Sequence, residues 1–353
     1  MAKQRIEYID AMRGFTMILV VFSHVCSMCF GDRSMGYNDV FFLFRLPCFF
    51  FISGWLFDPH RGTVPGVSSE AYYTGTVPSV RATLKHKFMV QIVPTVIFLL
   101  LLAPPPLFFS KLGATKGGYW FTFVLFEFFM ISMLSERFCK KWGLFIAIVL
   151  SVSSYFYDAY YNRYFSHFGW ITDAIGFLSF KTWRFYLFFY LGILIKRHFD
   201  DFLRLTSKYY VIILVILCFV IMAYLSHSES VVISYLIFAI AGVSGMVMIF
   251  TLFRLLYTSP STCSLKQLSI IHFPSSILIK IGTRTLDIYL LHYFFLPRFL
   301  LPYGEQLRAY NSPPLEFLVA LVLALVIVAI CLLVSYVIRL SPFLGHYLFG
   351  AKY

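Results

Sequence analysis

Long apolar stretches recur along the whole of this chain, and most have the length that a membrane-spanning helix requires. The stretch Val231–Phe253, for example, contains no charged side chain. A hydrocarbon core roughly 30 Å thick is crossed by about 20 apolar residues in an α-helix. The chain has 353 residues, of which 60% are hydrophobic. One soluble core cannot bury that much apolar surface, so the sequence predicts an all-α polytopic membrane protein.

We predict about ten transmembrane helices around a central polar cavity, in a single integral-membrane domain that covers residues 1–353. The first apolar run lacks the small-residue cleavage site of a signal peptide, and we expect no cleavable leader. The predicted spans are Ala11–Phe30, Val40–Phe57, Phe88–Phe109, Tyr119–Leu134, Leu144–Tyr157, Trp183–Ile195, Tyr209–Ser226, Val231–Phe253, Leu286–Leu301 and Leu315–Ile338.

The formal net charge of +13 favours a membrane topology rather than nucleic-acid binding, because Lys and Arg collect in cytosolic loops. With the N-terminus inside, the loops that face the cytosol hold most of the basic residues. We therefore expect a protein of the cell inner (cytoplasmic) membrane, in contact with the lipid bilayer, with both termini cytosolic and no nucleic-acid partner. The seven cysteines lie mostly in apolar runs and predict no disulfide framework, and we expect no metal site.

Two connections between predicted spans are long. Asp58–Lys87 is cytosolic in this topology and ends in a basic cluster. Asp158–Thr182 is external and rich in Tyr, Phe and Trp. Such aromatic residues indicate either a belt at the membrane interface or a surface that binds sugars, and both interpretations stay open.

Arg13 and His24 in the first predicted span point to chemistry. Eleven helical steps of about 100° return to within about 20° of the start, so both side chains share one face. The rise of about 16 Å places His24 near the middle of the bilayer if Arg13 lies at the cytosolic edge. Ionisable groups at that depth are costly and are usually functional. Histidine suits proton abstraction from a hydroxyl, and arginine suits phosphate oxygens.

A second histidine is predicted at a similar depth. Arg284 starts the ninth predicted span at its cytosolic edge, and His292 lies about 12 Å beyond it. A single membrane histidine can simply bond a neighbouring helix, but two at matched depth favour a functional role. Asp10 and Asp287 each lie at i, i+3 spacing from an arginine. They form salt bridges at the rim or orient those arginines, and both interpretations stay open.

Polar residues also occur inside two other predicted spans. Arg45 in the second span needs a carboxylate, a carbonyl or water as partner. Ser53 precedes Gly54, and this small pair allows another helix to approach closely. Glu127 follows Trp120 in the fourth span, where it is a partner for Arg45 or an auxiliary base.

Four ordered elements resemble a known family. They are the R-x10-H helix led by Asp10, the Phe49-Phe50-Phe51-x-Ser53-Gly54 helix, the basic run that ends in Pro94, and the segment Gly282-x-x-Thr285-Leu286-x-Ile288-Tyr289-Leu290-x-His292. Together they resemble acyltransferase family 3, bacterial integral-membrane acyltransferases with some eukaryotic relatives. Many members that modify polysaccharides carry a Trp-Ser-Leu-x-x-Glu element. Here Trp120 is followed by Phe121, so Glu127 does not carry over from that element.

The resemblance implies transfer of an acyl group, usually acetyl, from cytosolic acetyl-CoA or another acyl-CoA to a hydroxyl of a glycan, lipid-linked sugar or related acceptor. It implies that His24 is the catalytic residue and that Arg13 is its partner on the donor side. Direct transfer is the default mechanism, and a histidine-bound acyl intermediate is the alternative. Whether the protein forms a homodimer is a question that the sequence leaves open.

We assign the remaining residues to three groups. The donor group is Arg13, Arg81, Lys85, Lys87 and Arg284. The thioester or the developing oxyanion would be held by His292 or Tyr289. The acceptor side would use Arg45, Ser53, Trp120 and Glu127. The competing function is a proton-coupled transporter or lipid-carrier flippase, which also uses membrane His, Arg and Glu.

Overall fold

The computed structural model describes residues 6–31, 36–57, 80–102, 116–161, 177–226, 230–258, 269–309 and 312–351, together with residues 164 and 175. Every regular element within these residues is a helix, which confirms the predicted all-α fold class. The elements are α1 (Glu7–Cys29), α2 (Gly36–Leu56), α4 (Val80–Lys87), η1 (Phe88–Ile92), α5 (Val93–Leu102), η2 (Lys116–Gly118), α7 (Trp120–Phe138), η3 (Lys140–Trp142), α8 (Gly143–Tyr160), η5 (Phe180–Phe185), α10 (Tyr186–Arg197), α11 (Phe199–Thr206), α12 (Tyr209–Tyr224), α13 (Val231–Thr258), α14 (Ser269–Thr283), α15 (Thr285–Phe295), η7 (Arg298–Leu300), α16 (Tyr303–Ala309), α17 (Pro313–Ile338) and α18 (Pro342–Phe349).

Within the described residues, six helical stretches are long and apolar enough to cross a membrane, and one of them combines α4, η1 and α5. The spans are Glu7–Cys29, Asn38–Leu56, Arg81–Leu102, Gly143–Tyr160, Val231–Tyr257 and Pro313–Ile338, and α11 with α12 makes a seventh if that pair, bent by 84°, is one span. Helices also form at the other predicted spans, as α7, α10 and α15. The last two are short, with 12 and 11 residues. The protein is therefore a multi-pass membrane protein.

The ends of several helices follow from local sequence. α15 ends at Phe295 because Leu296 precedes Pro297 and adopts the extended backbone that a residue before proline favours. The predicted span to Leu301 is therefore too long. α17 begins with proline in its first turn, where the missing N–H costs no hydrogen bond.

The sequence prediction missed α14, because polar residues and Pro274 interrupt its apolar pattern. Packing against α1 explains why it forms part of the core. A Cβ at Gly14 would clash with the carbonyl oxygen of Leu278, and a Cβ at Gly282 would clash with that of Asp10. Two glycines thus let the backbones of α1 and α14 approach closely, as small residues do between membrane helices.

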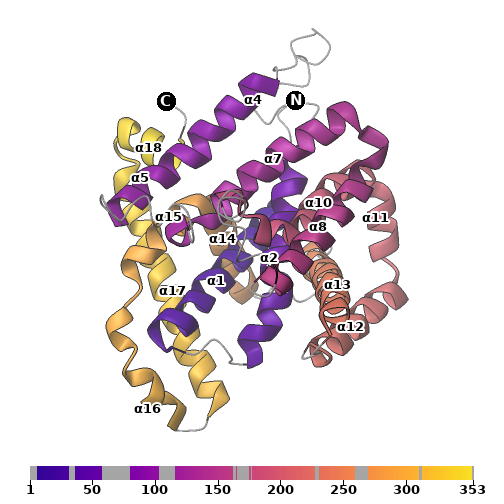
Figure 1. Ribbon diagram of the computed structural model, residues 1–353. Coiled ribbons are helices and arrows are strands. Elements are labelled where there is room, and N and C mark those ends of the chain that lie inside the picture. The colour runs from indigo at the N-terminus through magenta and orange to yellow at the C-terminus, as the bar shows by residue number, and fades with distance from the viewer. Residues whose placement is uncertain are drawn as a thin grey trace.

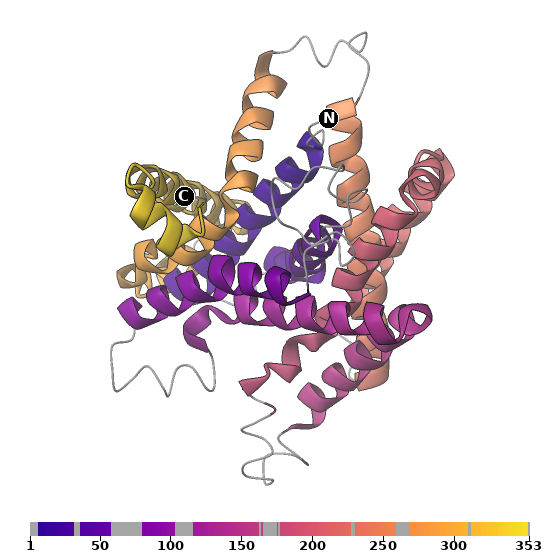
Figure 2. The same cartoon turned by 90° about the horizontal axis from the view of Figure 1, so that it is seen from above.

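α1 and α2 occupy the centre of the molecule, with α17 on one side and α13 on the other (Figure 1). α5 and α7 lie across one end of the bundle, as the view from above shows (Figure 2). The start of α1 lies toward that end in Figure 1, as do the helices α4 and α18. α10 packs on α2 where Gly54 abuts the Phe189 carbonyl, so the close approach predicted from Ser53-Gly54 is confirmed.

Parts of the two long connections lie outside the described residues. This applies to 58–79 of the cytosolic connection and to most of the aromatic stretch 162–176. It also applies to residues 103–109 of the predicted third span. The predictions for these segments stay predictions.

Candidate active site

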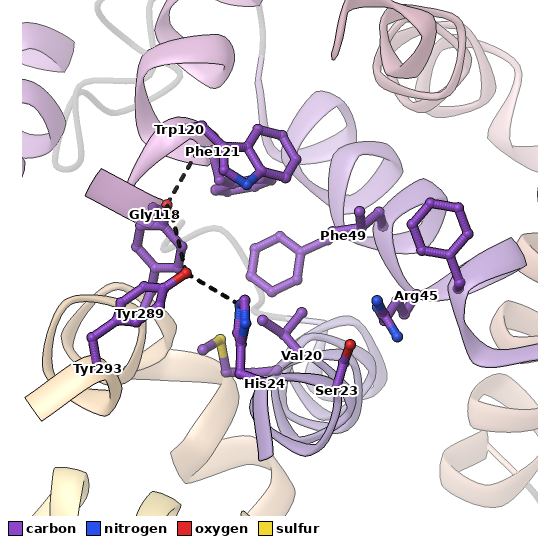
Figure 3. A pocket seen from close by; sticks show the side chains of 13 residues that line it. Val20, Ser23, His24, Arg45, Phe49, Gly118, Trp120, Phe121, Tyr289 and Tyr293 are labelled. Carbon is purple, nitrogen blue, oxygen red and sulfur yellow. Dashed lines mark hydrogen bonds between the residues drawn. The ribbon is translucent and has the colours of Figure 1, made fainter. Parts of the chain in front are cut away.

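A cavity of about 210 Å³ lies between α1, α2, α15 and the junction of η2 with α7. Its wall is largely apolar, and aromatic rings from Phe49, Trp120 and Phe121 cover much of it (Figure 3). The polar groups on the wall include the side chains of His24 and Arg45. A central cavity is thus present, but its wall is mostly apolar rather than polar as predicted. A few polar groups are set among aromatic surfaces, which is typical of small-molecule sites.

His24 reaches the cavity because α1 turns one face toward it. Met17, Val20 and His24 line the wall together, at the i, i+3, i+7 spacing of one helical face. The Nε2 atom of His24 lies 3.3 Å from the hydroxyl oxygen of Tyr293 on α15. Figure 3 shows this contact at the cavity edge.

His292 lies beside His24, with 5.2 Å between the ring centroids. The helical rise predicted similar depths for the two histidines, and the structure shows in addition that their rings lie side by side. His292 is fully buried and is not part of the cavity wall. Its Nδ1 lies 3.1 Å from the Ile288 carbonyl, while its Nε2 has no partner among the described residues. Because a carbonyl only accepts, Nδ1 carries the proton, and the neutral ring has no donor left for an oxyanion.

Tyr289 is better placed than His292 to hold a reacting oxygen, because it lines the cavity. Its hydroxyl accepts a hydrogen bond from the Phe121 backbone N–H at 3.2 Å and donates to the Gly118 carbonyl at 3.4 Å. Its predicted role in transfer stays a prediction.

Arg13 lies outside the cavity wall and bonds α15 at its first turn. Its Nη2 donates to the Thr285 hydroxyl at 2.6 Å. The contacts Arg13–Thr285 and His24–Tyr293 occur in the same order along both helices. α1 and α15 therefore carry an arginine at one end of their contact and a histidine pair at the other.

Asp287 has a different principal partner from the one expected. Two Asp287 oxygens accept bonds from Arg339 of α17 at 2.8 Å each, and Ser335 also donates to this carboxylate. Arg284 is 3.8 Å away with a side chain 43% exposed. Asp287 thus ties α15 to α17 and does not primarily orient Arg284. Three hydrogen bonds hold this buried carboxylate more firmly than a single distant contact.

The other basic residues of the predicted donor group differ in exposure. Arg81 and Lys85 on α4 are exposed, and Lys87 is half-buried with its ammonium 4.2 Å from the centroid of the Phe129 ring. Lys87 is close enough to Arg13 for their positive charges to interact. Arg13 and Lys87 are thus two cations of the predicted donor group that lie near each other.

Arg45 and Glu127 do not pair with each other, so that interpretation is wrong. Arg45 is buried and donates to the Asn38 side-chain oxygen at 2.8 Å. Glu127 lies 3.6 Å from Lys116 and accepts from the Trp183 indole at 2.8 Å. Arg45 lines the cavity and Glu127 does not. Lys116 lies between the third and fourth predicted spans, in a connection where no sequence pattern indicates a buried cation.

Three remaining predicted residues occupy separate places. Trp120 lines the cavity and stacks on Phe185. Ser53 donates to the Phe49 carbonyl of its own helix at 2.8 Å and is not part of the cavity wall. Asp10 is buried on α1 at its crossing with α14.

Tyr293 and Gly118 were missed by sequence reasoning. Tyr293 lines the cavity, bonds His24 and also donates to the Gly118 carbonyl at 3.1 Å. Gly118 has φ +91°, and a Cβ there would lie 2.8 Å from the Tyr293 ring. A glycine pair before Trp120 is a turn signal, but its partner on α15 is far away in sequence.

Comparison with known families decides the class of this site. A family model described as an acyltransferase domain, that of acyltransferase family 3, matches residues 6–333. The chain belongs to acyltransferase family 3. No curated protein and no solved structure was found to match it.

This membrane acyltransferase carries its cavity within the matched residues, from Met17 to Tyr293. Among the described residues, no group of three or more His, Cys, Asp and Glu side chains is arranged to hold a metal ion. The wall does offer a histidine, an arginine and tyrosine hydroxyls, which are suited to proton transfer and hydrogen bonding.

Proposed function

We propose that this acyltransferase moves an acyl group, in the simplest case acetyl, from acyl-CoA to a hydroxyl of an extracytoplasmic glycan or lipid-linked sugar. The observation that carries the proposal is the position of His24. It is the histidine on the cavity wall, and aromatic side chains surround it. Aromatic faces suit the apolar faces of sugar rings, and imidazole suits a hydroxyl proton.

The proposed reaction has two balanced steps. His24 takes the proton of the acceptor hydroxyl as its oxygen bonds to the thioester carbonyl carbon, which forms a tetrahedral oxyanion. The oxyanion then collapses, the carbon–sulfur bond breaks, and the CoA thiolate takes the proton from His24. The products are the acylated acceptor and CoA. Tyr289 lies on the wall, where its hydroxyl can stabilise the oxyanion once its proton turns from the Gly118 carbonyl to the reacting oxygen. Arg45 also lies on the wall, where its guanidinium can donate hydrogen bonds to the acceptor.

The donor would bind at the end of the bundle that holds the start of α1 together with α4 and α18 (Figure 1). Arg13 and Lys87 lie near enough there for their charges to interact, and phosphate oxygens suit a site with two cations. We propose that this end faces the cytosol of a cell with both termini inside, since the basic loops favour that topology. The thin pantetheine arm would then carry the thioester toward His24.

The first test uses purified protein with labelled acetyl-CoA and a polysaccharide or lipid-linked sugar. His24→Ala should lower transfer by about 10²- to 10⁴-fold, the usual contribution of a general base. His198→Ala is the control, because that histidine is exposed in the turn before α11. His24→Ala transfer near the wild-type rate would refute the assignment. Movement of a sugar lipid without acyl transfer would favour a flippase instead.

The second test separates the two sides of the membrane. Vesicles with a known protein orientation would hold acetyl-CoA on one side and acceptor on the other. Product should form only when acetyl-CoA is on the side of the N-terminus and the acceptor is opposite. Equal product with both substrates on the N-terminal side would refute transfer across the membrane, though not the acyltransferase activity.

A further inference from the structure

The Tyr293 hydroxyl lies between His24 and a backbone carbonyl. Its oxygen is 3.3 Å from His24 Nε2 and 3.1 Å from the Gly118 carbonyl oxygen. We propose that Tyr293 is a positioning residue that holds His24 with its proton on Nε2, so that Nδ1 is the atom that accepts the substrate proton. This inference rests on the proposed role of His24 as the base.

The proton count supports this arrangement. A carbonyl oxygen has no proton to donate, and a tyrosine hydroxyl has only one. When Tyr293 donates to Gly118, its oxygen accepts the Nε2–H of His24, and both contacts are satisfied. When Tyr293 donates to Nε2 instead, its bond to Gly118 is lost and His24 carries its proton on Nδ1. The first arrangement keeps both short contacts and leaves one ring nitrogen with a free lone pair.

The same contact contributes during the reaction. His24 becomes an imidazolium when Nδ1 takes the proton of the acceptor hydroxyl. Its Nε2–H then donates from a charged ring to the Tyr293 oxygen, and such charge-assisted bonds are roughly twice as strong as neutral ones. The proton leaves Nδ1 again to the CoA thiolate, and Tyr293 keeps its own proton throughout. Tyr293 thus takes the orienting place that an aspartate takes in a serine protease triad, without adding a charge.

Packing around Tyr293 holds its hydroxyl in place. The side chain is buried, and the Tyr119 ring meets it edge-on at a centroid distance of 5.2 Å. The Tyr119 hydroxyl donates to the Leu290 carbonyl at 2.7 Å, which joins the turn at Gly118 to α15. Only glycine fits at position 118, because any Cβ would meet the Tyr293 ring. The Gly118 carbonyl and Tyr293 therefore lie on segments that pack directly against each other.

Two tyrosines give a matched experiment. Tyr293→Phe removes the hydroxyl that bonds His24, whereas Tyr235→Phe removes a buried hydroxyl that donates to Ser151 on α8 and is not part of the cavity wall. We expect Tyr293→Phe to lower kcat by about 10- to 100-fold, the range found when the hydrogen-bond partner of a metal-bound histidine is lost, with little change in either KM. Tyr235→Phe should lower the melting temperature but keep kcat near wild type.

Suppose that His24→Ala is inactive. The inference is then overturned if the two tyrosine variants lose kcat equally, or if Tyr293→Phe keeps a kcat near wild type. If His24→Ala is active, the proposed function fails and this inference falls with it. A measurement on the wild-type protein covers the case in which Tyr293→Phe does not fold. Nitrogen-15 spectra of labelled histidine, assigned by the signals lost in His24→Gln, should show neutral His24 protonated at Nε2. Protonation at Nδ1 would overturn the inference.

Discussion

The two ends of the α1–α15 contact hold their polar side chains in different ways. At one end Arg13 bonds Thr285, and Asp287 in the same turn of α15 accepts two hydrogen bonds of 2.8 Å from Arg339. At the other end His24 meets the hydroxyl of Tyr293 at 3.3 Å. One end thus contains charged side chains. The contact at the other end, here called the neutral end, joins a phenol hydroxyl to an imidazole and includes no Asp, Glu, Lys or Arg side chain.

The difference matches two kinds of task. Removing one partner of a buried ion pair lowers the stability of the fold by several kcal/mol. The charged end is therefore suited to holding helices together. A neutral histidine can gain and lose a proton without separating from a fixed counter-ion, so the other end is suited to chemistry. Under the proposed function, the same pair of helices combines a rigid anchor with a histidine that gains and loses a proton. The variants below test this division.

The largest loss of stability should come from the charged end. Asp287→Ala leaves Arg339 without its carboxylate, and we expect a loss of about 3–5 kcal/mol in the free energy of unfolding. The control is Asp201→Ala. Asp201 and Arg204 have side chains 74% and 81% exposed, and such pairs contribute about 0–1 kcal/mol. Thermal unfolding in detergent measures both, and similar losses would contradict the anchor role.

A smaller loss of stability should come from Gly118→Ala at the neutral end. The positive φ and the contact with Tyr293 predict a cost of about 1–3 kcal/mol. Transfer should fall as well, because Tyr293 is displaced from His24. Gly345→Ala is the control, since its Cβ would meet nothing closer than 3.7 Å. If Gly118→Ala keeps full activity, the turn does not support the site.

Arg13→Ala should weaken acyl-CoA binding by about tenfold or more, because a bond to a charged group contributes about 1.5–3 kcal/mol. Thr285→Val removes the hydroxyl that Arg13 bonds but keeps the cation, so it should change affinity much less. Calorimetry with acetyl-CoA measures both. Unchanged affinity in Arg13→Ala would place the donor elsewhere.

The smallest effect should come from the exposed residues of α4. Arg81→Ala and Lys85→Ala should each lower acetyl-CoA affinity by about twofold at low salt, because exposed charges act on phosphates only through screened attraction. High salt should abolish the difference from wild type. An effect as large as that of Arg13→Ala would show that α4 contacts the donor directly.

Several features of the site could be predicted because they depend on one helix at a time. The helical rise and the apolar pattern brought His24 and His292 to similar depths, and their rings do meet. The catalytic roles of these residues stay predictions. The partners of Glu127 and Asp287 could not be predicted, since Lys116 and Arg339 belong to other segments. Other basic side chains of similar length could have paired with these carboxylates, and the sequence alone does not choose among them.

The sequence by itself determined the helical membrane class, the family and the shared face of Arg13 and His24. These follow from hydrophobic length, helical period and ordered motifs, which are local along the chain. Only the tertiary structure decided that α14 packs on α1 and that Tyr293 joins His24 to the Gly118 carbonyl. A hydrogen bond needs atoms within about 3 Å of each other. Atoms of distant segments come within that distance only when the segments pack together, so no local sequence pattern predicts the contact.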